Sequence, residues 1–361
     1  MVGMEQRALG TTELRVSAVT FGAMGLGAPG KDEDERRIAI LHAALEEGVT
    51  AIDTAPLYGF GRSERVVARA ISEQRPRPLV LTKVGLRWDD PSQHGEPLFR
   101  TRDEMGRELV VRRNSRPESI LLEIERSLER LGVERLDLVQ VHQRDHLVPI
   151  DETMGVLSDA VRAGTVRYVG VSNFSASEVL QARAALGEIR LASLQSEFNL
   201  LCSEVERRAL RAVRRAGIGF LAYSPLAKGL LSGTYGPDRA LDQSDFRSEL
   251  KFFSTQSRMS IAAAMREVVF PIATRHGAKP AQIALAWALA HSPVSAVVVG
   301  ASSVLQARQN AEAARIFLEK FELDELEAAF LRVRKACSDT RRVRVWKRAE
   351  RAVRSLLGRA R

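Results

Sequence analysis

The feature of this chain that most constrains its fold is an alternation of short apolar runs with longer amphipathic segments. Between the runs, apolar side chains recur at helical spacing, as in DERRIAILHAALEEG and PESILLEIERSLERLG. Strands that alternate with helices predict a parallel sheet, and eight such units in about 300 residues match a closed (β/α)8 TIM barrel. The eight predicted strands are AVTFG, TAIDT, LVLTK, LDLVQVH, VRYVGVS, LASLQS, GFLAYS and SAVVVG.

Three segments depart from this rhythm. Near the N-terminus, LGTTELRVS has no helical period, and we expect a short β-hairpin over the barrel floor. Residues 88–116 are polar and punctuated by Gly and Pro, and we expect a long loop after the third strand. A second irregular stretch, residues 232–253, follows the seventh strand. Loops that follow the C-terminal ends of barrel strands commonly build the active site.

The charge of the chain is concentrated at its C-terminus. Residues 332–361 hold 12 Lys or Arg and 2 acidic residues, a balance of +10, so the net charge of +9 leaves −1 for the other 331 residues. We therefore expect a barrel domain over residues 1–331 and a basic amphipathic helical extension over 332–361, and no nucleic-acid partner for the barrel. The extension packs on the barrel or is solvated, or else contacts an acidic partner or an anionic membrane.

The cysteines and the apolar runs of the chain are compatible with a reducing cytoplasm. The two cysteines, Cys202 and Cys337, provide neither a disulfide framework nor a metal-ligand spacing. The N-terminal segment lacks a basic region followed by an apolar one, and no run approaches the length of a membrane-spanning helix. These observations predict a cytoplasmic protein.

A glycine pattern offers an alternative fold. The segment from Gly25 to Gly30 satisfies G-x-G-x-x-G, follows a predicted strand, and precedes Asp53 by 23 residues, as in a Rossmann dinucleotide-binding fingerprint. However, Pro29 stands where the fingerprint needs a regular helix start. The acidic residues that follow would also repel a pyrophosphate at this helix N-terminus. We therefore favour a flexible glycine loop above the barrel.

Four ionisable residues follow three consecutive predicted strands. Asp53 and Tyr58 come just after the second strand, Lys83 ends the third, and His142 ends the fourth. Because the C-terminal ends of barrel strands face one mouth, we expect these side chains to converge. Individually, a histidine at a strand end is usually structural and an Asp–Lys pair is often only an ion pair. Their convergence indicates a catalytic site.

The four residue types suit proton donation to a carbonyl oxygen. Free tyrosine has a pKa of about 10, and a nearby ammonium group favours the phenolate and lowers that pKa. Lys83 can supply the ammonium group, and Asp53 can hold it charged and oriented. His142 can hydrogen-bond the substrate oxygen while Tyr58 donates the proton and a hydride reaches the carbon. This chemistry needs no metal.

Several further motifs follow in a characteristic order. They are LGVERLDLVQVH, GVSNF, YSPLAKGLLSG, and GAS followed by Gln306 and Asn310. These motifs, the block around Asp53 and Tyr58, and the strand that ends in Lys83 follow one another along the chain. Together they make residues 5–330 resemble the aldo-keto reductase superfamily. The insertion beginning GLRW is similar to a bacterial subgroup that includes general stress reductases and inositol-linked reductases.

The resemblance implies an NADP(H)-dependent reductase of aldehydes or ketones whose cofactor lies extended across the barrel mouth. It assigns Ser172, Asn173 and Gln195 to the nicotinamide carboxamide, and Tyr223 to stacking on the ring. It places the pyrophosphate along Ser224, Pro225, Leu226 and Gly229. It places the adenosine end at Gly300, Ser302, Gln306, Gln309 and Asn310, with Arg247 at the 2′-phosphate. We also expect Trp88 to wall the pocket of a small carbonyl substrate.

Two questions stay open at this stage. The family pattern commonly has Arg or Lys near Ser302 and Ser303 and Glu at Gln309, so NAD(H) is an alternative to NADP(H). Potassium-channel beta subunits share this fold, this cofactor and a tetrad equivalent to Asp53, Tyr58, Lys83 and His142, but they mainly regulate a partner. The name tetrad is kept below for these four residues. A redox-sensing regulatory subunit is therefore the alternative function, distinguished by very slow NADPH oxidation.

Overall fold

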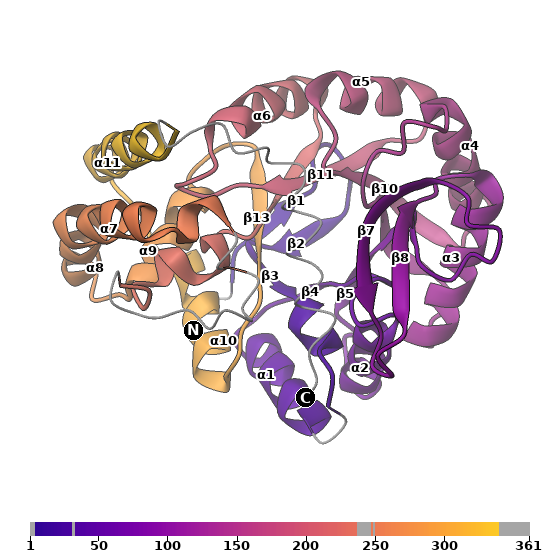
Figure 1. Cartoon of the computed structure of the whole chain (residues 1–361), viewed down its shortest axis with the longest axis horizontal. Coiled ribbons are helices and arrows are strands. Elements are labelled where there is room, and N and C mark those ends of the chain that lie inside the picture. Colours follow the sequence, from indigo (N-terminus) through magenta and orange to yellow (C-terminus); the bar gives the residue numbers. More distant parts are fainter. Residues whose placement is uncertain (1–3, 31–32, 237–246, 248–249, 339–361) are drawn as a thin grey trace.

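Within residues 4–30, 33–236, 247 and 250–338, which the computed structural model describes, eight parallel strands pair in chain order and close into a barrel (Figure 1). The last strand pairs with the first, since Val297 to Val299 lie beside Val19 to Phe21. This confirms the predicted (β/α)8 architecture. The barrel strands are β3 (Val19–Gly22), β4 (Ala51–Asp53), β5 (Leu79–Val84), β9 (Leu136–Val141), β10 (Val166–Ser172), β11 (Leu191–Glu197), β12 (Gly219–Tyr223) and β13 (Val294–Val299).

Amphipathic helices surround the barrel because each buries one apolar face against the strands. In α3, for example, Ile120 and Ile124 are buried at helical spacing, and Pro117 occupies the first turn, where its missing N–H costs no helical hydrogen bond. The helices are α1 (Asp34–Glu46), α2 (Arg62–Ile71), α3 (Pro117–Leu131), α4 (Ile150–Arg162), α5 (Ala176–Ala185), α6 (Glu204–Ala216), α7 (Thr255–Ala264), α8 (Phe270–Arg275), α9 (Pro280–Leu289), α10 (Val304–Glu312) and α11 (Lys320–Ser338).

The N-terminal hairpin closes the barrel floor, as predicted. Its strands β1 (Gln6–Ala8) and β2 (Arg15–Ser17) are antiparallel, and the turn carries Leu9 and Leu14 into the barrel. These leucines are fully or almost fully buried against Leu81 and Leu138. The lower half of the barrel interior is therefore apolar, and polar side chains begin one layer above it.

The expectation of a long loop over residues 88–116 is wrong. Strands β6 (Leu86–Arg87), β7 (Glu96–Arg102) and β8 (Glu108–Arg113) form a three-stranded antiparallel sheet beside the barrel mouth. Phe99 and Val111 face inward and pack with Leu57 and Leu86, while the opposite face carries Arg100, Arg102, Glu108 and Arg112 among apolar residues. The apolar content of each strand is too small to mark it locally, and the surface that covers it comes from other parts of the chain.

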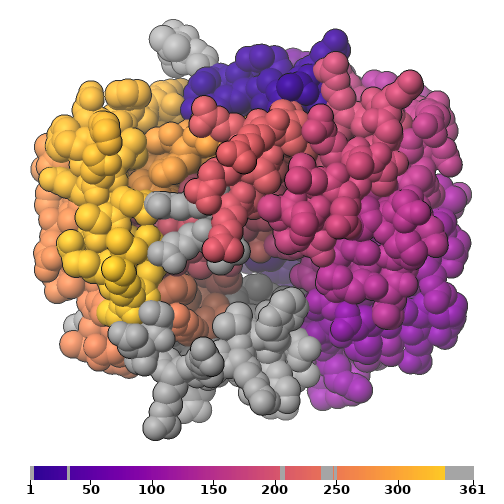
Figure 2. Space-filling view, turned by 90° about the horizontal axis from the view of Figure 1, so that it is seen from above, coloured from indigo at the N-terminus to yellow at the C-terminus, as the bar shows by residue number. Residues whose placement is uncertain are grey.

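The last described helix lies at the side of the barrel. Helix α11 crosses the expected boundary at residue 331 without interruption and packs beside α7 (Figures 1 and 2). The basic amphipathic helix predicted within 343–357 lies outside the described residues, as do residues 237–246 and 248–249 of the irregular stretch. Across the described part of the chain, no helix combines the length and apolarity needed to span a bilayer.

Glu123 is a buried acid in the helical layer of the fold. It is 4% exposed on α3, and its Oε1 accepts the N–H of Gly85 at 2.9 Å, just past the end of β5. Burial raises the pKa of Glu123 to about 8, against weaker lowering by the Gly85 N–H and by Arg87. A carboxyl group whose pKa is higher in the folded protein than in the unfolded chain costs stability as pH rises between the two values.

We therefore expect Glu123→Gln to stabilise the protein above neutral pH, since an amide keeps the acceptor without ionising. The raised pKa of Glu123 corresponds to a gain in the free energy of unfolding of at most about 5 kcal/mol at pH 8 and of almost nothing below pH 4.5. Urea unfolding of both proteins between pH 5 and 9 measures the difference. A constant difference over this range would contradict the assignment.

Candidate active site

The four ionisable residues converge at one end of the barrel, where the sequence predicted them. Asp53 ends β4, Lys83 lies near the end of β5, and His142 directly follows β9. Lys83 Nζ donates to Asp53 Oδ1 at 2.6 Å, to the carbonyl of Thr54 at 2.9 Å and to Tyr58 Oη at 3.3 Å. The rings of Tyr58 and His142 meet edge to face, with 6.1 Å between their centroids. Lys83 therefore joins the carboxylate to the phenol.

The segment that carries Tyr58 is fixed by a backbone contact between two loops. A Cβ on Gly27 would come within 2.5 Å of the carbonyl group of Tyr58, and a Cβ on Gly59, whose φ is +63°, would come within 2.0 Å of the Gly27 oxygen. Only glycine permits this approach at both positions. The glycine loop therefore packs against the segment of Tyr58, and the barrel excludes the Rossmann interpretation of its spacing.

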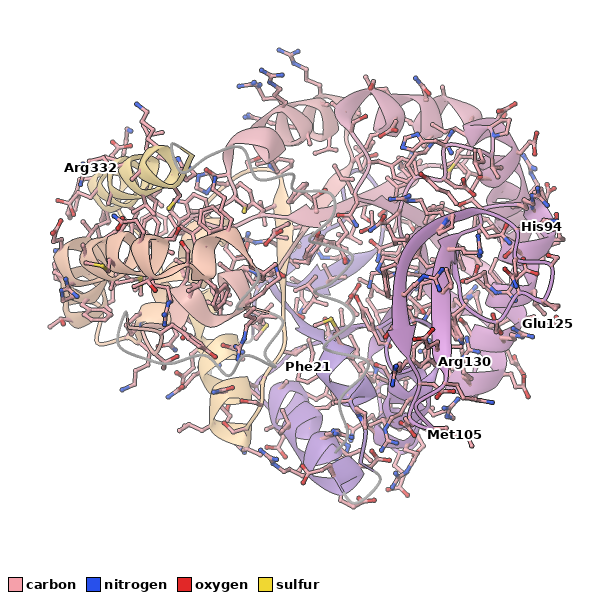
Figure 3. The ribbon with its side chains drawn as sticks, viewed as in Figure 1. Phe21, His94, Met105, Glu125, Arg130 and Arg332 are labelled. Carbon is pink, nitrogen blue, oxygen red and sulfur yellow. The ribbon has the colours of Figure 1, made fainter. Side chains whose placement is uncertain are left out.

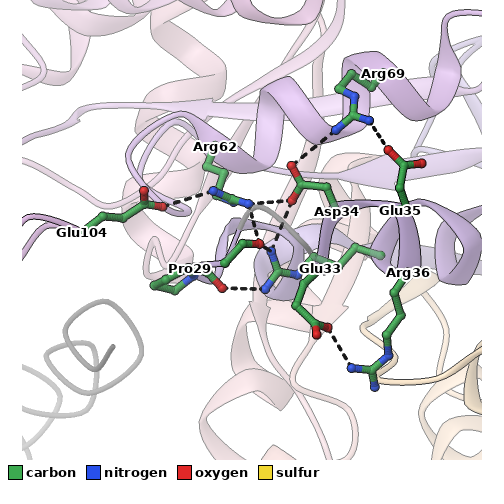
Figure 4. A network of polar contacts seen from close by, with 10 residues as sticks. Pro29, Glu33, Asp34, Glu35, Arg36, Arg62, Arg69 and Glu104 are labelled. Atoms are coloured by element: carbon green, nitrogen blue, oxygen red, sulfur yellow. Dashed lines mark hydrogen bonds and ion pairs between the residues drawn. The ribbon is translucent and has the colours of Figure 1, made fainter. Parts of the chain in front are cut away.

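The acidic residues at the start of α1 pair with arginines (Figure 4). Asp34 accepts from Arg62 at 2.6 Å and from Arg37 at 3.3 Å, and it also pairs with Arg69. Arg62 additionally donates to the Gly30 carbonyl at 2.8 Å and reaches Glu104 in the β7–β8 turn at 3.4 Å. This network connects the glycine loop and the sheet of β6, β7 and β8, named the added sheet below, to α2, the helix that follows Tyr58.

The electrostatics of the site differ in one respect from the sequence expectation. Burial raises the pKa of Tyr58, and this effect exceeds the lowering by Lys83. The pKa of Lys83 is also raised, because Asp53 and Tyr58 together outweigh its desolvation. The pKa of His142 falls well below its usual value through burial and the neighbouring Lys83. Near neutral pH the site therefore presents a protonated phenol, an ammonium group and a neutral imidazole.

Residues expected around the nicotinamide lie next to the tetrad. Asn173 Nδ2 donates to the His142 carbonyl at 3.1 Å, and Tyr223 Oη donates to Asn173 Oδ1 at 2.9 Å. Ser172 is buried beside them and accepts from the same amide at 3.1 Å. In contrast, the Gln195 amide donates to Asp53 Oδ2 at 2.7 Å. Gln195 thus contacts the tetrad directly, which its strand position alone does not reveal.

Gln140 is a site residue that the sequence analysis missed. It is fully buried on β9, and its Nε2 lies 3.4 Å from Asp53 Oδ2. The available signal was its spacing: residues two apart on a strand share a face, so Gln140 points into the barrel with His142. A polar residue at an inward position above an apolar layer could have been singled out.

The loop after β12 turns sharply through left-handed backbone. Ser224, Ala227, Lys228 and Gly229 have φ values of +49°, +47°, +56° and +100°, and Leu226, between Ser224 and Ala227, has a φ of −96°. Within this turn the N–H groups of Ala227 and Gly229 donate to the carbonyls of Ser224 and Leu226, each at 2.9 Å. The assignment of the pyrophosphate to Ser224, Pro225, Leu226 and Gly229 stays a prediction.

The residues expected at the adenosine end cluster at the start of α10. Gln306 Oε1 accepts from both the N–H and the hydroxyl of Ser302, at 2.9 and 2.8 Å, and Asn310 donates to the Gly300 carbonyl at 3.2 Å. The backbone oxygen of Gln309 accepts from the buried amide of Gln282.

Two arginines lie near residues that the family resemblance assigns to the cofactor. Arg36 on α1 reaches the cluster and donates to the Ser302 carbonyl at 3.0 Å. Arg247, expected at the 2′-phosphate, contacts the Lys228 carbonyl and stacks 5.0 Å from the Tyr235 ring centroid, and its role toward the cofactor stays a prediction. It therefore lies by the β12 loop.

Trp88 borders a cavity outside the tetrad. Its ring packs on Phe60 with 5.2 Å between centroids, and both line a cavity of about 890 Å³ between α2 and the β7–β8 hairpin. Met105, at the outer edge of the molecule in Figure 3, lies across this cavity in the hairpin turn and is 78% exposed. Trp88 thus has a place in a pocket wall, and its role toward a substrate stays a prediction.

Comparison with known proteins agrees with this geometry. Residues 18–330 match the model of the Aldo/keto reductase family. Aldo-keto reductase YhdN of Bacillus subtilis (strain 168) is 32% identical over 290 residues, which are 79% of this chain and 81% of that protein. Versiconal hemiacetal acetate reductase of Aspergillus parasiticus is 30% identical over 339 residues, 91% of this chain and 97% of that protein.

A solved structure extends the similarity to three dimensions. The glycerol dehydrogenase of Gluconobacter oxydans superposes with a TM-score of 0.80 at 32% identity, covering 91% of this chain and 95% of that one. Sequence and structural relatives together support an enzyme whose class of reaction is carbonyl reduction. The chain belongs to the aldo/keto reductase family.

Proposed function

We propose that this protein is an NADP(H)-dependent reductase that converts a small aldehyde or ketone to an alcohol, with Tyr58 as the proton donor. The observation that carries the proposal is the position of Lys83 Nζ, which is buried between Asp53 at 2.6 Å and Tyr58 at 3.3 Å. An ammonium group held in this way stabilises the phenolate that remains after proton transfer.

The other side chains complete the requirements for reduction. The neutral imidazole of His142 can donate one N–H to the carbonyl oxygen and so position it beside Tyr58. Negative charge develops on that oxygen as the carbon is reduced, and the phenol proton neutralises it. The raised pKa of Tyr58 keeps the proton on the phenol until that charge appears.

NADP(H), when bound, supplies the hydride at this site. Asn173 and Ser172 would hold the carboxamide and Tyr223 would face the ring, while the loop from Ser224 to Gly229 would take the pyrophosphate. The hydrogen bond of Tyr223 to Asn173 supports this set, since it fixes both side chains next to His142.

Arg36 supports NADPH as the preferred form. The sequence around Ser302 lacks the basic residues common in the family, but Arg36 brings a guanidinium group to the Ser302 carbonyl from α1. Its side chain is 64% exposed and pairs with Glu33 at 2.9 Å, and a phosphate monoester that displaced this carboxylate would accept hydrogen bonds from the guanidinium group.

The test is consumption of NADPH and of NADH by the purified protein over a panel of small aldehydes and ketones, with Arg36→Ala in parallel. We expect turnover with several carbonyl compounds. The substitution should raise the KM for NADPH about tenfold and leave that for NADH within twofold, since one charge-assisted contact contributes about 1.5 kcal/mol. Arg100→Ala, an exposed arginine on β7, serves as the control for general loss of charge.

The outcomes separate the two functions. Very slow oxidation of NADPH with every substrate, despite tight NADPH binding, would favour the redox-sensing regulatory subunit. Equal effects of Arg36→Ala on both nucleotides would remove the 2′-phosphate assignment but keep the reductase.

A further inference from the structure

The two carboxylate oxygens of Asp53 have different partners. Oδ1 accepts from Lys83 Nζ at 2.6 Å, and Oδ2 accepts from Gln195 Nε2 at 2.7 Å with Gln140 Nε2 at 3.4 Å. The carboxylate is 2% exposed, so these side chains take the place of water around its charge. One oxygen is thus bound to a cation and the other to neutral amides.

The orientation of the Gln140 amide is fixed by its own surroundings. Its Oε1 lies 3.4 Å from Ser193 Oγ and 3.5 Å from Gln195 Nε2, both of which are donors. A flipped amide would place its NH2 group against the Gln195 NH2 group and its oxygen against the Asp53 carboxylate. The side chain also has room only because Gly170 faces it, where a Cβ would come within 3.0 Å of Gln140 Cγ.

From this geometry we propose that Gln140 is a positioning residue for the Tyr58 proton donor and acts through Asp53. This proposal rests on the proposed function of the site. By holding Oδ2 with a neutral donor, Gln140 and Gln195 keep Oδ1 directed at Lys83 and leave the lysine charge available to the phenol. A cation in the same position would compete with Lys83 for the carboxylate, and an apolar residue would leave one oxygen partly unsolvated.

The groups that titrate around this carboxylate come from three elements: Lys83 on β5, Tyr58 after β4 and His142 after β9. Gln140 and Gln195 do not titrate, so the wild-type site has no further ionisation at the Oδ2 side. An acid introduced at position 140 would add one, and its effect on Tyr58 can be measured.

The first variant is Gln140→Met, which keeps the volume and removes the donor. We expect the Tyr58 pKa to rise by about one unit, because Asp53 is less stabilised and Lys83 less well oriented. The readout is the ultraviolet difference titration of tyrosinate in the NADPH complex, with the same variant in a Tyr58→Phe background subtracted. The pH midpoint of alcohol oxidation should move in the same alkaline direction, with about a tenfold loss of kcat at pH 7.

The second variant is Gln140→Glu, which has nearly the same shape. When protonated, its carboxyl group can donate to Asp53 as the amide does, whereas its ionised form repels that carboxylate. We expect near wild-type reduction at low pH and a loss of turnover through a new ionisation as pH rises. Wild-type protein and Gln140→Met should lack this step.

Ser295→Ala is the matched control, since it removes a partly buried hydrogen bond from a barrel strand to Ala8 at the floor end. It should lower stability without changing either titration. If Gln140→Met does not fold, Ser193→Ala removes a group that orients the amide and should shift Tyr58 in the same direction by a smaller amount.

An unchanged Tyr58 titration in folded Gln140→Met, or a pH profile of Gln140→Glu that matches the wild type, overturns the proposal. Because the spectroscopic titration needs no turnover, a failure here is distinct from a failure of the reductase function.

Discussion

Tyr58→Phe is expected to lower the kcat for carbonyl reduction by about 10³-fold while NADPH still binds. A positioned general acid raises the reaction rate by roughly 10²–10⁴-fold. The Tyr58 hydroxyl is the proton-bearing group that Lys83 contacts. The substitution removes one oxygen and keeps the ring that meets His142 edge to face. Cofactor affinity should therefore change less than twofold.

Steady-state kinetics at saturating NADPH and fluorescence titration of the nucleotide measure the two quantities separately. Tyr168→Phe is the matched control, because Tyr168 packs with the apolar floor cluster, away from the tetrad. A Tyr58→Phe protein with near wild-type kcat would show that another group donates the proton. A parallel loss of NADPH binding would instead indicate damage to the fold of the mouth.

Lys83→Met is expected to remove turnover to a similar degree and, unlike Tyr58→Phe, to destabilise the fold. Asp53 and Lys83 are 2% and 1% exposed, so methionine would leave a buried carboxylate without its cation. Removing one partner of a buried ion pair costs roughly 3–5 kcal/mol. The phenol would also lose the positive charge that opposes the rise of its pKa.

The double variant Asp53→Asn with Lys83→Met separates these two effects. Asparagine is neutral, so the double variant should regain most of the lost stability and remain inactive. Urea unfolding followed by circular dichroism gives the free energies, and single-turnover reduction gives the chemical rate. Stability that stays low in the double variant would mean that Lys83 contributes mainly by packing.

The architecture could be predicted because its signals are local. Barrel strands lie between cores on both sides and are rich in apolar residues, as in β13, where Ser295 is the one polar residue, and covering helices such as α3 show their own period. The tetrad was predictable for a related reason. Once the strands are known to be parallel, their C-terminal ends must meet, so Asp53, Lys83 and His142 converge whatever the details of packing.

The added sheet and the partners of the tetrad could not be predicted in this way. Strands β7 and β8 owe their stability to a small apolar face covered by Leu57 and Leu86, which the chain brings in from elsewhere. Likewise, Gln195 could be assigned by motif, but its bond to Asp53 depends on the side chains that meet in the barrel centre. Amide orientation depends on three-dimensional neighbours, which spacing alone does not specify.

The sequence by itself determined the barrel, the order of its units and the convergence of Tyr58 with Asp53, Lys83 and His142, because these follow from periodicity and strand direction. Tertiary structure decided the rest. It set the direction of the Tyr58 pKa through desolvation, brought Arg36 to the Ser302 carbonyl, and placed Gln140 on Asp53. These outcomes depend on burial and on contacts between segments distant in the chain, which a one-dimensional pattern does not contain.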